Sequence, residues 1–149
     1  MMVAIGSDHR GYKLKEEVKK YLSGKGIEVI DFGADSEERV DSLPIAVNVC
    51  KSVQNGEAKR GVLICGTGLA MTIIANKFKR IMCTLCNDEL SAARSREHND
   101  SNVLAIGAEM VDSDKAIKIV KTWLETQHLG GVYAERVDRI KALEDENMK

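Results

Sequence analysis

Hydrophobic residues along the chain fall into short runs, each followed by a segment in which they recur every three or four positions. Short runs rich in β-branched residues predict strands, and the longer spacing predicts amphipathic helices. The expected strands are 2–6, 27–33, 61–65, 81–86 and 102–107. The expected helices are 12–22, 43–53, 70–78, 89–98 and 114–124, followed by a charged helix over 133–149.

The strict alternation of strands and helices predicts an α/β fold. We expect a doubly wound, Rossmann-like sheet of five parallel strands with helices on both faces. The length and the absence of repeats or linkers favour one domain over residues 1–149. The last helix has a narrow apolar stripe, formed by Val137, Ile140 and Leu143. We therefore expect this C-terminal helix to contact a partner subunit.

Composition and charge exclude several classes of partner. A net charge of -1 leaves no basic excess for binding nucleic acid or an anionic membrane. No signal peptide is evident, and no apolar run approaches the roughly 20 residues that cross a bilayer. The four cysteines, Cys50, Cys65, Cys83 and Cys86, mostly lie in apolar stretches typical of reduced thiols. We expect a cytoplasmic protein that binds neither nucleic acid nor membrane.

The third expected strand ends at Cys65, and the turn Gly66-Thr67-Gly68 leads directly into a helix. In an open α/β sheet, ligands bind beyond the carboxyl ends of the strands. Glycines allow several N–H groups to point at one spot, and a helix N-terminus adds positive potential. Such a turn binds an anion and favours the thiolate form of a cysteine.

Three functional interpretations of this turn compete with a buried, structural cysteine. A phosphate-binding Walker loop is excluded because no Gly-Lys-Ser/Thr ending follows. A dinucleotide fingerprint remains a weak alternative: Met71 replaces its third glycine, although Asp88 lies about 20 residues further on, where the ribose-binding acid is expected. The third interpretation is a small-molecule site in which Cys65 acts as base or nucleophile beside an anion hole.

Two histidine segments could contribute to such a site. Asp8 and His9 follow the first strand and would face Cys65 if the first and third strands are neighbours, although Asp8 could also cap the next helix. His98 precedes the fifth strand, at the wrong end to meet Cys65 within one subunit, so a catalytic role for it requires a partner subunit. His128 is expected on the surface.

The remaining cysteines do not point to a metal or redox site. Cys83 and Cys86 are three residues apart on a strand and would point to opposite faces, so we expect both to be structural. No cluster has the ligand spacing of a zinc site, so no metal is expected.

Taken together, the chain resembles the B-type ribose-5-phosphate isomerases and their galactose-6-phosphate isomerase relatives. The resemblance is collinear from Val3 to about Leu143 and is carried by the segments SDHRGY, EVIDFG, ICGTGLAMTIIANK, SREHNDSNVLAIG and GGVYAERV. It implies aldose–ketose isomerisation through an enediolate, without cofactor or metal. It also implies a homodimer with two shared active sites, and leaves open whether dimers pair into tetramers.

The resemblance also implies residue roles. Cys65 would be the base that moves a proton between C1 and C2, Thr67 would assist, and His98 of a partner subunit would open the sugar ring. The backbone of Gly66, Gly68, Leu69 and Ala70 would hold the enediolate oxygens. Asp8, His9 and Asn99 would bind sugar hydroxyls, and Arg136 would bind the phosphate.

The chain departs from the family at the far end of the substrate. The family usually has arginine where this chain has Glu109 and Val132, and its usual Asp-Tyr-Pro is replaced by "DSLP". Ala70 stands where the turn usually has glycine. Phosphate recognition depends on charge-assisted arginine contacts, for which Arg139 offers a substitute. A different or unphosphorylated sugar, or a non-catalytic sugar-binding protein, are therefore alternatives to ribose 5-phosphate isomerisation.

Overall fold

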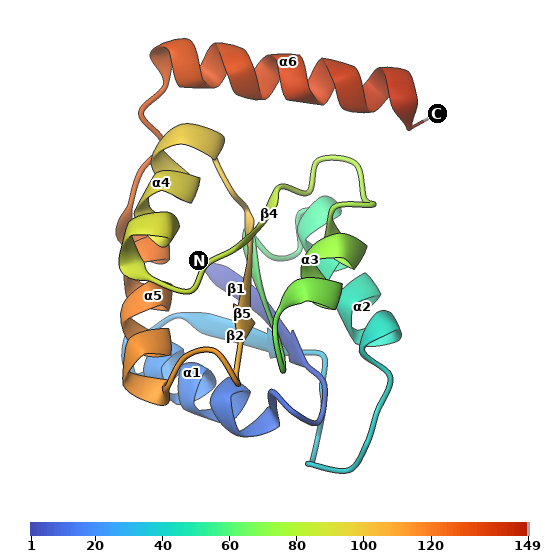
Figure 1. Cartoon of the computed structure of the whole chain (residues 1–149), viewed down its shortest axis with the longest axis vertical. Helices are drawn as coiled ribbons and strands as arrows, with labels where there is room; N and C mark the ends of the chain where they lie inside the picture. Colours follow the sequence, from blue (N-terminus) through green and yellow to red (C-terminus); the bar gives the residue numbers. More distant parts are fainter. Residues whose placement is uncertain (149) are drawn as a thin grey trace.

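A parallel five-stranded sheet with the order β2-β1-β3-β5-β4 lies between two layers of helices (Figure 1). The structure is a computed structural model that describes residues 1–148; Lys149, the last residue of the expected C-terminal helix, lies outside the described residues. The strands are β1 (Met2–Ser7), β2 (Glu28–Asp31), β3 (Arg60–Cys65), β4 (Cys83–Leu85) and β5 (Val103–Gly107). The helices are α1 (Tyr12–Gly24), α2 (Ser42–Gln54), α3 (Leu69–Ala75), α4 (Glu89–Asn99), α5 (Ser113–Glu125) and α6 (Gly131–Asn147).

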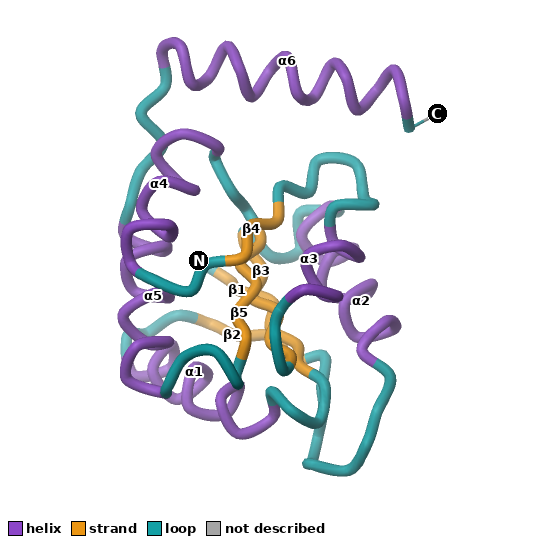
Figure 2. The backbone as a smooth tube through the Cα atoms, in the orientation of Figure 1, coloured by secondary structure: helices purple, strands orange, loops and turns teal. Residues whose placement is uncertain are grey.

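Helices α1, α4 and α5 cover one face of the sheet, and α2 and α3 cover the other (Figures 1 and 2). Successive residues of β3 serve the two faces in turn. Val62 and Ile64 pack in the core under α1 and α5, whereas Leu63 and Cys65 pack in the core under α2 and α3. The expected doubly wound α/β fold is therefore confirmed, and every residue of β3 is buried as expected for a central strand.

The strands at the two edges of the sheet are shorter than the apolar runs that predicted them. Each of β2 and β4 has a single neighbour in the sheet, so fewer of its residues find a hydrogen-bonding partner. Helix α3 also ends early, at Ala75, because the N–H groups of Lys77 and Phe78 close tight turns onto Ile74 and Ala75.

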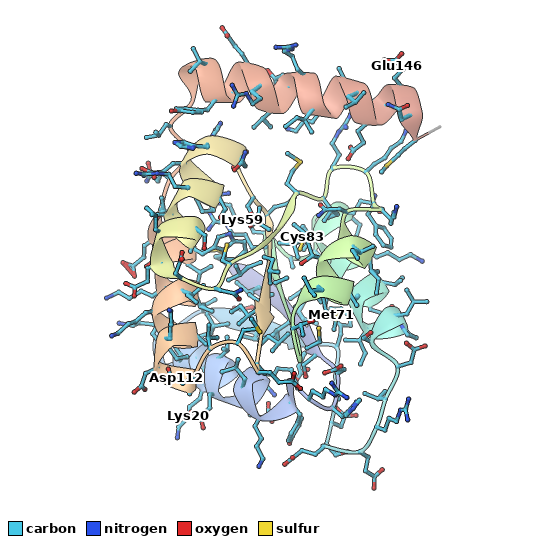
Figure 3. All side chains as sticks on the ribbon, viewed as in Figure 1. Lys20, Lys59, Met71, Cys83, Asp112 and Glu146 are labelled. Carbon is cyan, nitrogen blue, oxygen red and sulfur yellow. The ribbon has the colours of Figure 1, made fainter. Side chains whose placement is uncertain are left out.

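Cys83 and Cys86 lie in different cores, as their spacing predicted. Cys83 packs under α2 and α3, on the same side as Met71 (Figure 3), whereas Cys86 packs under α4 and α5. Burial raises the pKa of the Cys50 thiol to about 12 and also raises the pKa of Cys83 and of Cys86. These three thiols stay protonated at neutral pH, which fits a structural role.

Helix α6 lies across one end of the molecule and packs on α4 (Figure 1). Val137 is the one α6 side chain buried against the rest of the chain, among residues 1–148. Near the other end of α6, the Arg80 guanidinium donates to Glu144 at 2.8 Å and to Asp145 at 2.7 and 2.9 Å. Tyr133 and Ile140 are partly buried, whereas Leu143 is 58% exposed, and the contact of α6 with a partner subunit stays a prediction.

Candidate active site

The carboxyl ends of β1 and β3 lie side by side, as the sequence analysis expected for neighbouring strands. Ser7 pairs with Ile64 in the parallel ladder, and the Asp8 N–H donates to the Ile64 carbonyl at 3.2 Å. A Cβ at Gly11 would lie only 2.7 Å from the same carbonyl oxygen, so glycine is required for this close approach. The first turn is thereby fixed next to Cys65.

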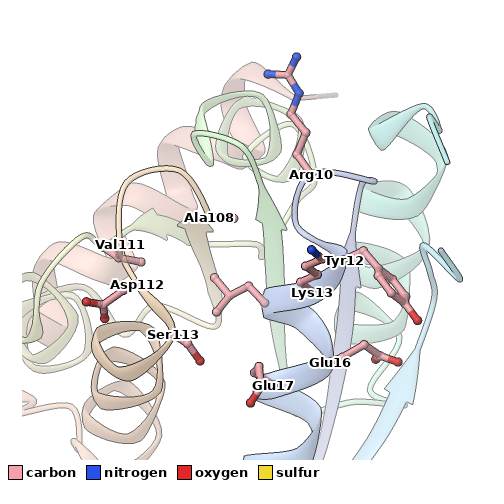
Figure 4. A pocket seen from close by; sticks show the side chains of 10 residues that line it. Arg10, Tyr12, Lys13, Glu16, Glu17, Ala108, Val111, Asp112 and Ser113 are labelled. Carbon is pink, nitrogen blue, oxygen red and sulfur yellow. The ribbon is translucent and has the colours of Figure 1, made fainter. Parts of the chain in front are cut away.

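A cavity of about 390 Å³ opens at this point, lined by Asp8, His9, Arg10, Arg39 and the turn 65–67. Larger cavities also lie elsewhere among residues 1–148. One, of about 530 Å³, lies between the first turns of α1 and α5 (Figure 4), and another, of about 820 Å³, runs along β2. Neither is lined by a thiol or an imidazole, so the combination of reactive groups, rather than size, identifies the Cys65 cavity as the candidate active site.

Cys65 is almost buried, with 6% of its surface exposed, and its Sγ accepts a hydrogen bond from the Gly68 N–H at 3.1 Å. Gly68 has a φ of +80°, in the left-handed region that favours glycine. A Cβ there would also lie 2.6 Å from Leu85 Cδ1 and 3.1 Å from the carbonyl carbon of Ile106. The turn therefore needs glycine both for its backbone conformation and for space. An N–H donated to sulfur stabilises the thiolate that a base requires.

The other N–H groups of this turn are only partly used by the protein. The Leu69 N–H donates to Thr67 Oγ1 at 3.3 Å, and the Thr72 N–H to the Gly68 carbonyl at 3.1 Å. The N–H groups of Ala70 and Met71 find no acceptor in residues 1–148. Donors at the start of α3 are thus available to a bound oxygen atom.

The loop after β5 closes the site from the other side. The Ala108 N–H donates to the Cys65 carbonyl at 2.8 Å, and the Glu109 N–H to the Gly66 carbonyl at 2.9 Å. The Glu109 carboxylate lies against the turn, and its Oε1 is 3.4 Å from Arg10 Nη1. Glu109, noted from the sequence only as a departure from the family, therefore lies directly beside the turn that lines the cavity.

Two arginines that the sequence analysis did not single out also line the cavity. Arg10 follows Asp8 and His9 in the first turn, and Arg39 belongs to the segment between β2 and α2. The Val40 N–H donates to His9 Nδ1 at 3.3 Å, which ties this segment to the first turn. Both arginines lie in turns at the carboxyl ends of strands, and that position was the signal by which they could have been found.

His98, Asn99 and Arg136 do not reach the cavity within one chain. In the β3–β5 register, Cys65 pairs with Gly107, whereas the amino end of β5, which follows His98, pairs with Gly61 at the start of β3. His98 and Asn99 lie at the end of α4, next to the amino ends of the strands, whereas Cys65 lies at a carboxyl end. Arg136 is exposed on α6. The expected separation of His98 from Cys65 within one subunit is confirmed.

The His98 ring is held by α6. It stacks on the Tyr133 ring, with centroids 4.2 Å apart and an interplanar angle of 10°. His128, expected on the surface, is instead half-buried, and its Nδ1 lies 2.9 Å from the Glu97 carbonyl oxygen. That expectation was wrong because the segment after α5 packs back against the end of α4.

Asp8 has a structural role in addition to lining the cavity. Its Oδ1 accepts the N–H groups of Arg10 at 3.0 Å and Gly11 at 3.1 Å. The residue at the N-cap of α1 is Gly11, so Asp8 stabilises the turn before the helix rather than capping the helix itself. One oxygen, Oδ2, is free of these turn contacts and available to a ligand.

Within residues 1–148, no three His, Cys, Asp or Glu side chains are grouped so that they could hold a metal ion. In the same part of the chain, no helix has the length and apolar character needed to cross a membrane.

Comparison with known proteins identifies the family. Residues 3–140 match the model of a family described as Ribose/Galactose Isomerase. The chain is 45% identical to ribose-5-phosphate isomerase B of Escherichia coli (strain K12), over 95% of each chain. It is 40% identical to a 4-deoxy-4-sulfo-D-erythrose isomerase of Clostridium sp. (strain MSTE9), over 85% of this chain and 80% of that protein.

The fold agrees with the sequence comparison. A solved structure of Clostridium thermocellum ribose-5-phosphate isomerase B superimposes with a TM-score of 0.96 and 45% identity, covering 98% of this chain and 99% of that one. The matches confirm the resemblance that was seen in the sequence, including the segments around Cys65 and His98. With the family model spanning most of its length, the chain belongs to the ribose/galactose isomerase family.

Proposed function

We propose that the protein is an aldose–ketose isomerase that interconverts ribose 5-phosphate and ribulose 5-phosphate without a cofactor. The observation that carries this proposal is the Cys65 thiol, which accepts the Gly68 N–H at 3.1 Å inside a cavity of about 390 Å³. Homologues named ribose-5-phosphate isomerase B, at up to 45% identity over nearly the whole chain, support the same activity.

The chemistry is a proton transfer between adjacent carbons. The Cys65 thiolate removes the proton from C2 of the open-chain aldose, and the electron pair moves to the carbonyl oxygen at C1 to give an enediolate. Transfer of the hydroxyl proton from O2 to O1, together with return of the carbon-bound proton to C1, forms the C2 carbonyl and gives the ketose. A proton next to a carbonyl is hard to remove unless the enolate oxygen is stabilised, and the backbone N–H groups of residues 66–70, together with Thr67, are suited to that task.

We assign hydroxyl binding to Asp8 and His9, which line the same cavity. Ring opening would fall to His98 and further hydroxyl binding to Asn99, with Arg136 contacting the phosphate. These three residues lie away from Cys65 within one chain, so the complete site requires a second copy. We therefore propose a homodimer with two shared sites, which could pair further into a tetramer.

The exposed apolar side chains of α3 support such an assembly. Leu69 and Ile73, directly after the Cys65 turn, are 56% and 63% exposed. A patch of this kind beside a site that is incomplete in one chain is suited to burial against another copy. The four free thiols fit a reducing compartment, so we place the protein in the cytoplasm.

The identity of the sugar is the least constrained part of the proposal. Glu109 places a carboxylate beside the Cys65 turn where the family usually has arginine, and this favours, as a second candidate, the same chemistry on a sugar with a different distal end. The relative named 4-deoxy-4-sulfo-D-erythrose isomerase supports variation of this kind within the family. A non-catalytic sugar-binding protein would not need the thiol.

The test is to measure isomerisation of ribose 5-phosphate, ribose and allose by the full-length protein and by the Cys65→Ala variant. Turnover of ribose 5-phosphate that disappears in Cys65→Ala supports the proposal. Turnover only of an unphosphorylated sugar would instead support the second candidate, the same chemistry on a different sugar. The absence of turnover for all three sugars, with binding retained, would favour the binding protein. Light scattering on the same samples tests the homodimer.

A further inference from the structure

Two arginines line the Cys65 cavity without a role in the mechanism above. Arg10 comes from the turn between β1 and α1, and Arg39 from the segment between β2 and α2. Because β1 has both β2 and β3 as neighbours, these two segments meet at the same edge of the sheet as Cys65. The cavity therefore contains two cationic groups that its own subunit supplies.

Glu109 places a negative charge beside the glycine turn that lines this cavity. The Glu109 N–H donates to the Gly66 carbonyl at 2.9 Å, and a Cβ at Gly66 would lie 3.0 Å from Glu109 Oε1. The carboxylate is thus held against the glycine turn. A substrate phosphate bound here would meet a like charge, which opposes binding unless a cation lies between them.

Arg10 is in position to be that cation. Its Nη1 lies 3.4 Å from Glu109 Oε1, and the two side chains are 61% and 54% exposed. This separation exceeds the roughly 2.7–2.9 Å of a strong charge-assisted hydrogen bond, and exposed pairs of this kind contribute little to stability. The guanidinium can therefore turn toward a bound anion at small cost. Figure 4 shows the Arg10 side chain extending away from the other labelled residues of the neighbouring cavity.

Arg39 is the second arginine that lines this cavity. Its side chain makes no hydrogen bond or ion pair with the residues that the structure describes. The segment that carries it is nevertheless fixed, because the Val40 N–H donates to His9 Nδ1 at 3.3 Å. A guanidinium that is held near a cavity, with all of its donors free, is suited to bidentate binding of an oxyanion.

We propose that Arg10 and Arg39 bind the anionic group at the distal end of the sugar substrate, a phosphate or a similar oxyanion, and that Arg10 leaves Glu109 when the anion binds. The inference rests on the proposed function, since one cavity then holds the reacting carbons and the anion. The family usually has arginine at the position of Glu109. In this chain, Arg10 of the β1–α1 turn would supply the cation in its place.

The experiment separates binding from turnover. In the Cys65→Ala background, which cannot transfer the proton, calorimetry measures the affinity for ribose 5-phosphate with Arg10→Ala, Arg39→Ala, Glu109→Gln or Arg136→Ala added. Lys20→Ala, on the exposed face of α1 (Figure 3), is the control for the loss of one positive charge. Thermal melts establish that each variant is folded.

We expect Arg10→Ala and Arg39→Ala each to weaken binding by roughly ten- to a hundredfold, the range for a lost hydrogen bond to a charged group. Glu109→Gln should tighten binding several-fold, and Lys20→Ala should leave it unchanged. Unchanged affinity in both arginine variants, or a loss confined to Arg136→Ala, would overturn the proposal, as would the absence of ribose 5-phosphate binding by Cys65→Ala itself. Arginine-dependent binding without any turnover by the unmodified protein would support this anion site and refute the proposed function instead.

Discussion

Gly68 gives the Cys65 turn its left-handed backbone conformation and donates its N–H to the Cys65 sulfur. Replacing Gly68 by alanine tests both roles. A non-glycine residue at its φ of +80° costs about 1–2 kcal/mol. The added methyl group would lie 2.6 Å from Leu85 Cδ1, which can move, and 3.1 Å from the carbonyl carbon of Ile106, which cannot move without shifting β5. Overpacking of this kind adds about 1–3 kcal/mol. The free energy of unfolding should therefore fall by about 2–5 kcal/mol.

Gly56→Ala is a matched control. Gly56 has a φ of +82°, nearly that of Gly68, but no atom lies within 4 Å of the position of its missing Cβ. It should lose only the conformational part, about 1–2 kcal/mol. Urea unfolding followed by circular dichroism gives both values, and the difference between them isolates the effect of the contacts at Leu85 and Ile106.

The same substitution should reduce catalysis by the folded protein. The Gly68 N–H is the donor to Cys65 Sγ, and a shift of the turn by a fraction of an ångström would move both groups relative to the substrate. We expect kcat/KM to fall on the order of a hundredfold in Gly68→Ala, and to be unchanged in Gly56→Ala. Equal destabilisation of the two variants would refute the packing argument. Unchanged turnover by folded Gly68→Ala would refute the role of the turn.

Three further predictions concern the thiol, the distant histidine and an ion-pair cluster. Cys65→Ser should lower kcat by roughly 10²–10⁴-fold in the isomerase assay, because a hydroxyl is a far less effective base than the thiol at neutral pH. The urea midpoint should be nearly unchanged, because serine is about the same size as the buried cysteine. Tyr133→Leu removes the ring stacked on His98 and should lower kcat several-fold on ring-closed substrate, with a loss of about 0.5–1.5 kcal/mol in unfolding free energy; an unchanged kcat would mean that the stacking does not position His98. Partial burial alone would raise the pKa of the Asp31 carboxyl, but hydrogen bonds from Lys15 Nζ (2.7 Å), Lys19 Nζ (2.6 Å) and the Gly33 N–H (2.8 Å) outweigh it and hold that pKa below its ordinary value. Because the folded pKa lies below the unfolded value of about 4, the stabilisation is present above pH 4 and is lost as the pH falls through the folded pKa. Asp31→Asn should therefore be less stable than the unmodified protein by about 2 kcal/mol at pH 7, with the gap narrowing as the pH falls below about 4; a gap independent of pH would contradict the assignment.

Much of the candidate site followed from local sequence because its parts depend on local geometry. The turn 65–68 needs glycine at a left-handed position and a strand that ends at the thiol, and both are visible in the order of residues. The separation of His98 from Cys65 followed from the direction of a parallel strand. Arg10 and Arg39 lie in turns at the carboxyl ends of strands, but other charged residues share those turns, and which of them line the cavity depends on how β1, β2 and β3 are arranged side by side.

The sequence by itself determined the class of fold and the glycine turn that follows Cys65, because hydrophobic periodicity and backbone conformation act over a few neighbouring residues. The tertiary structure alone decided what surrounds that turn. Which strand lies next to β3, the contact of Glu109 with Gly66, and the stacking of His98 on Tyr133 all join residues far apart in the chain. Such contacts depend on how whole elements pack against one another, and no short stretch of sequence encodes them.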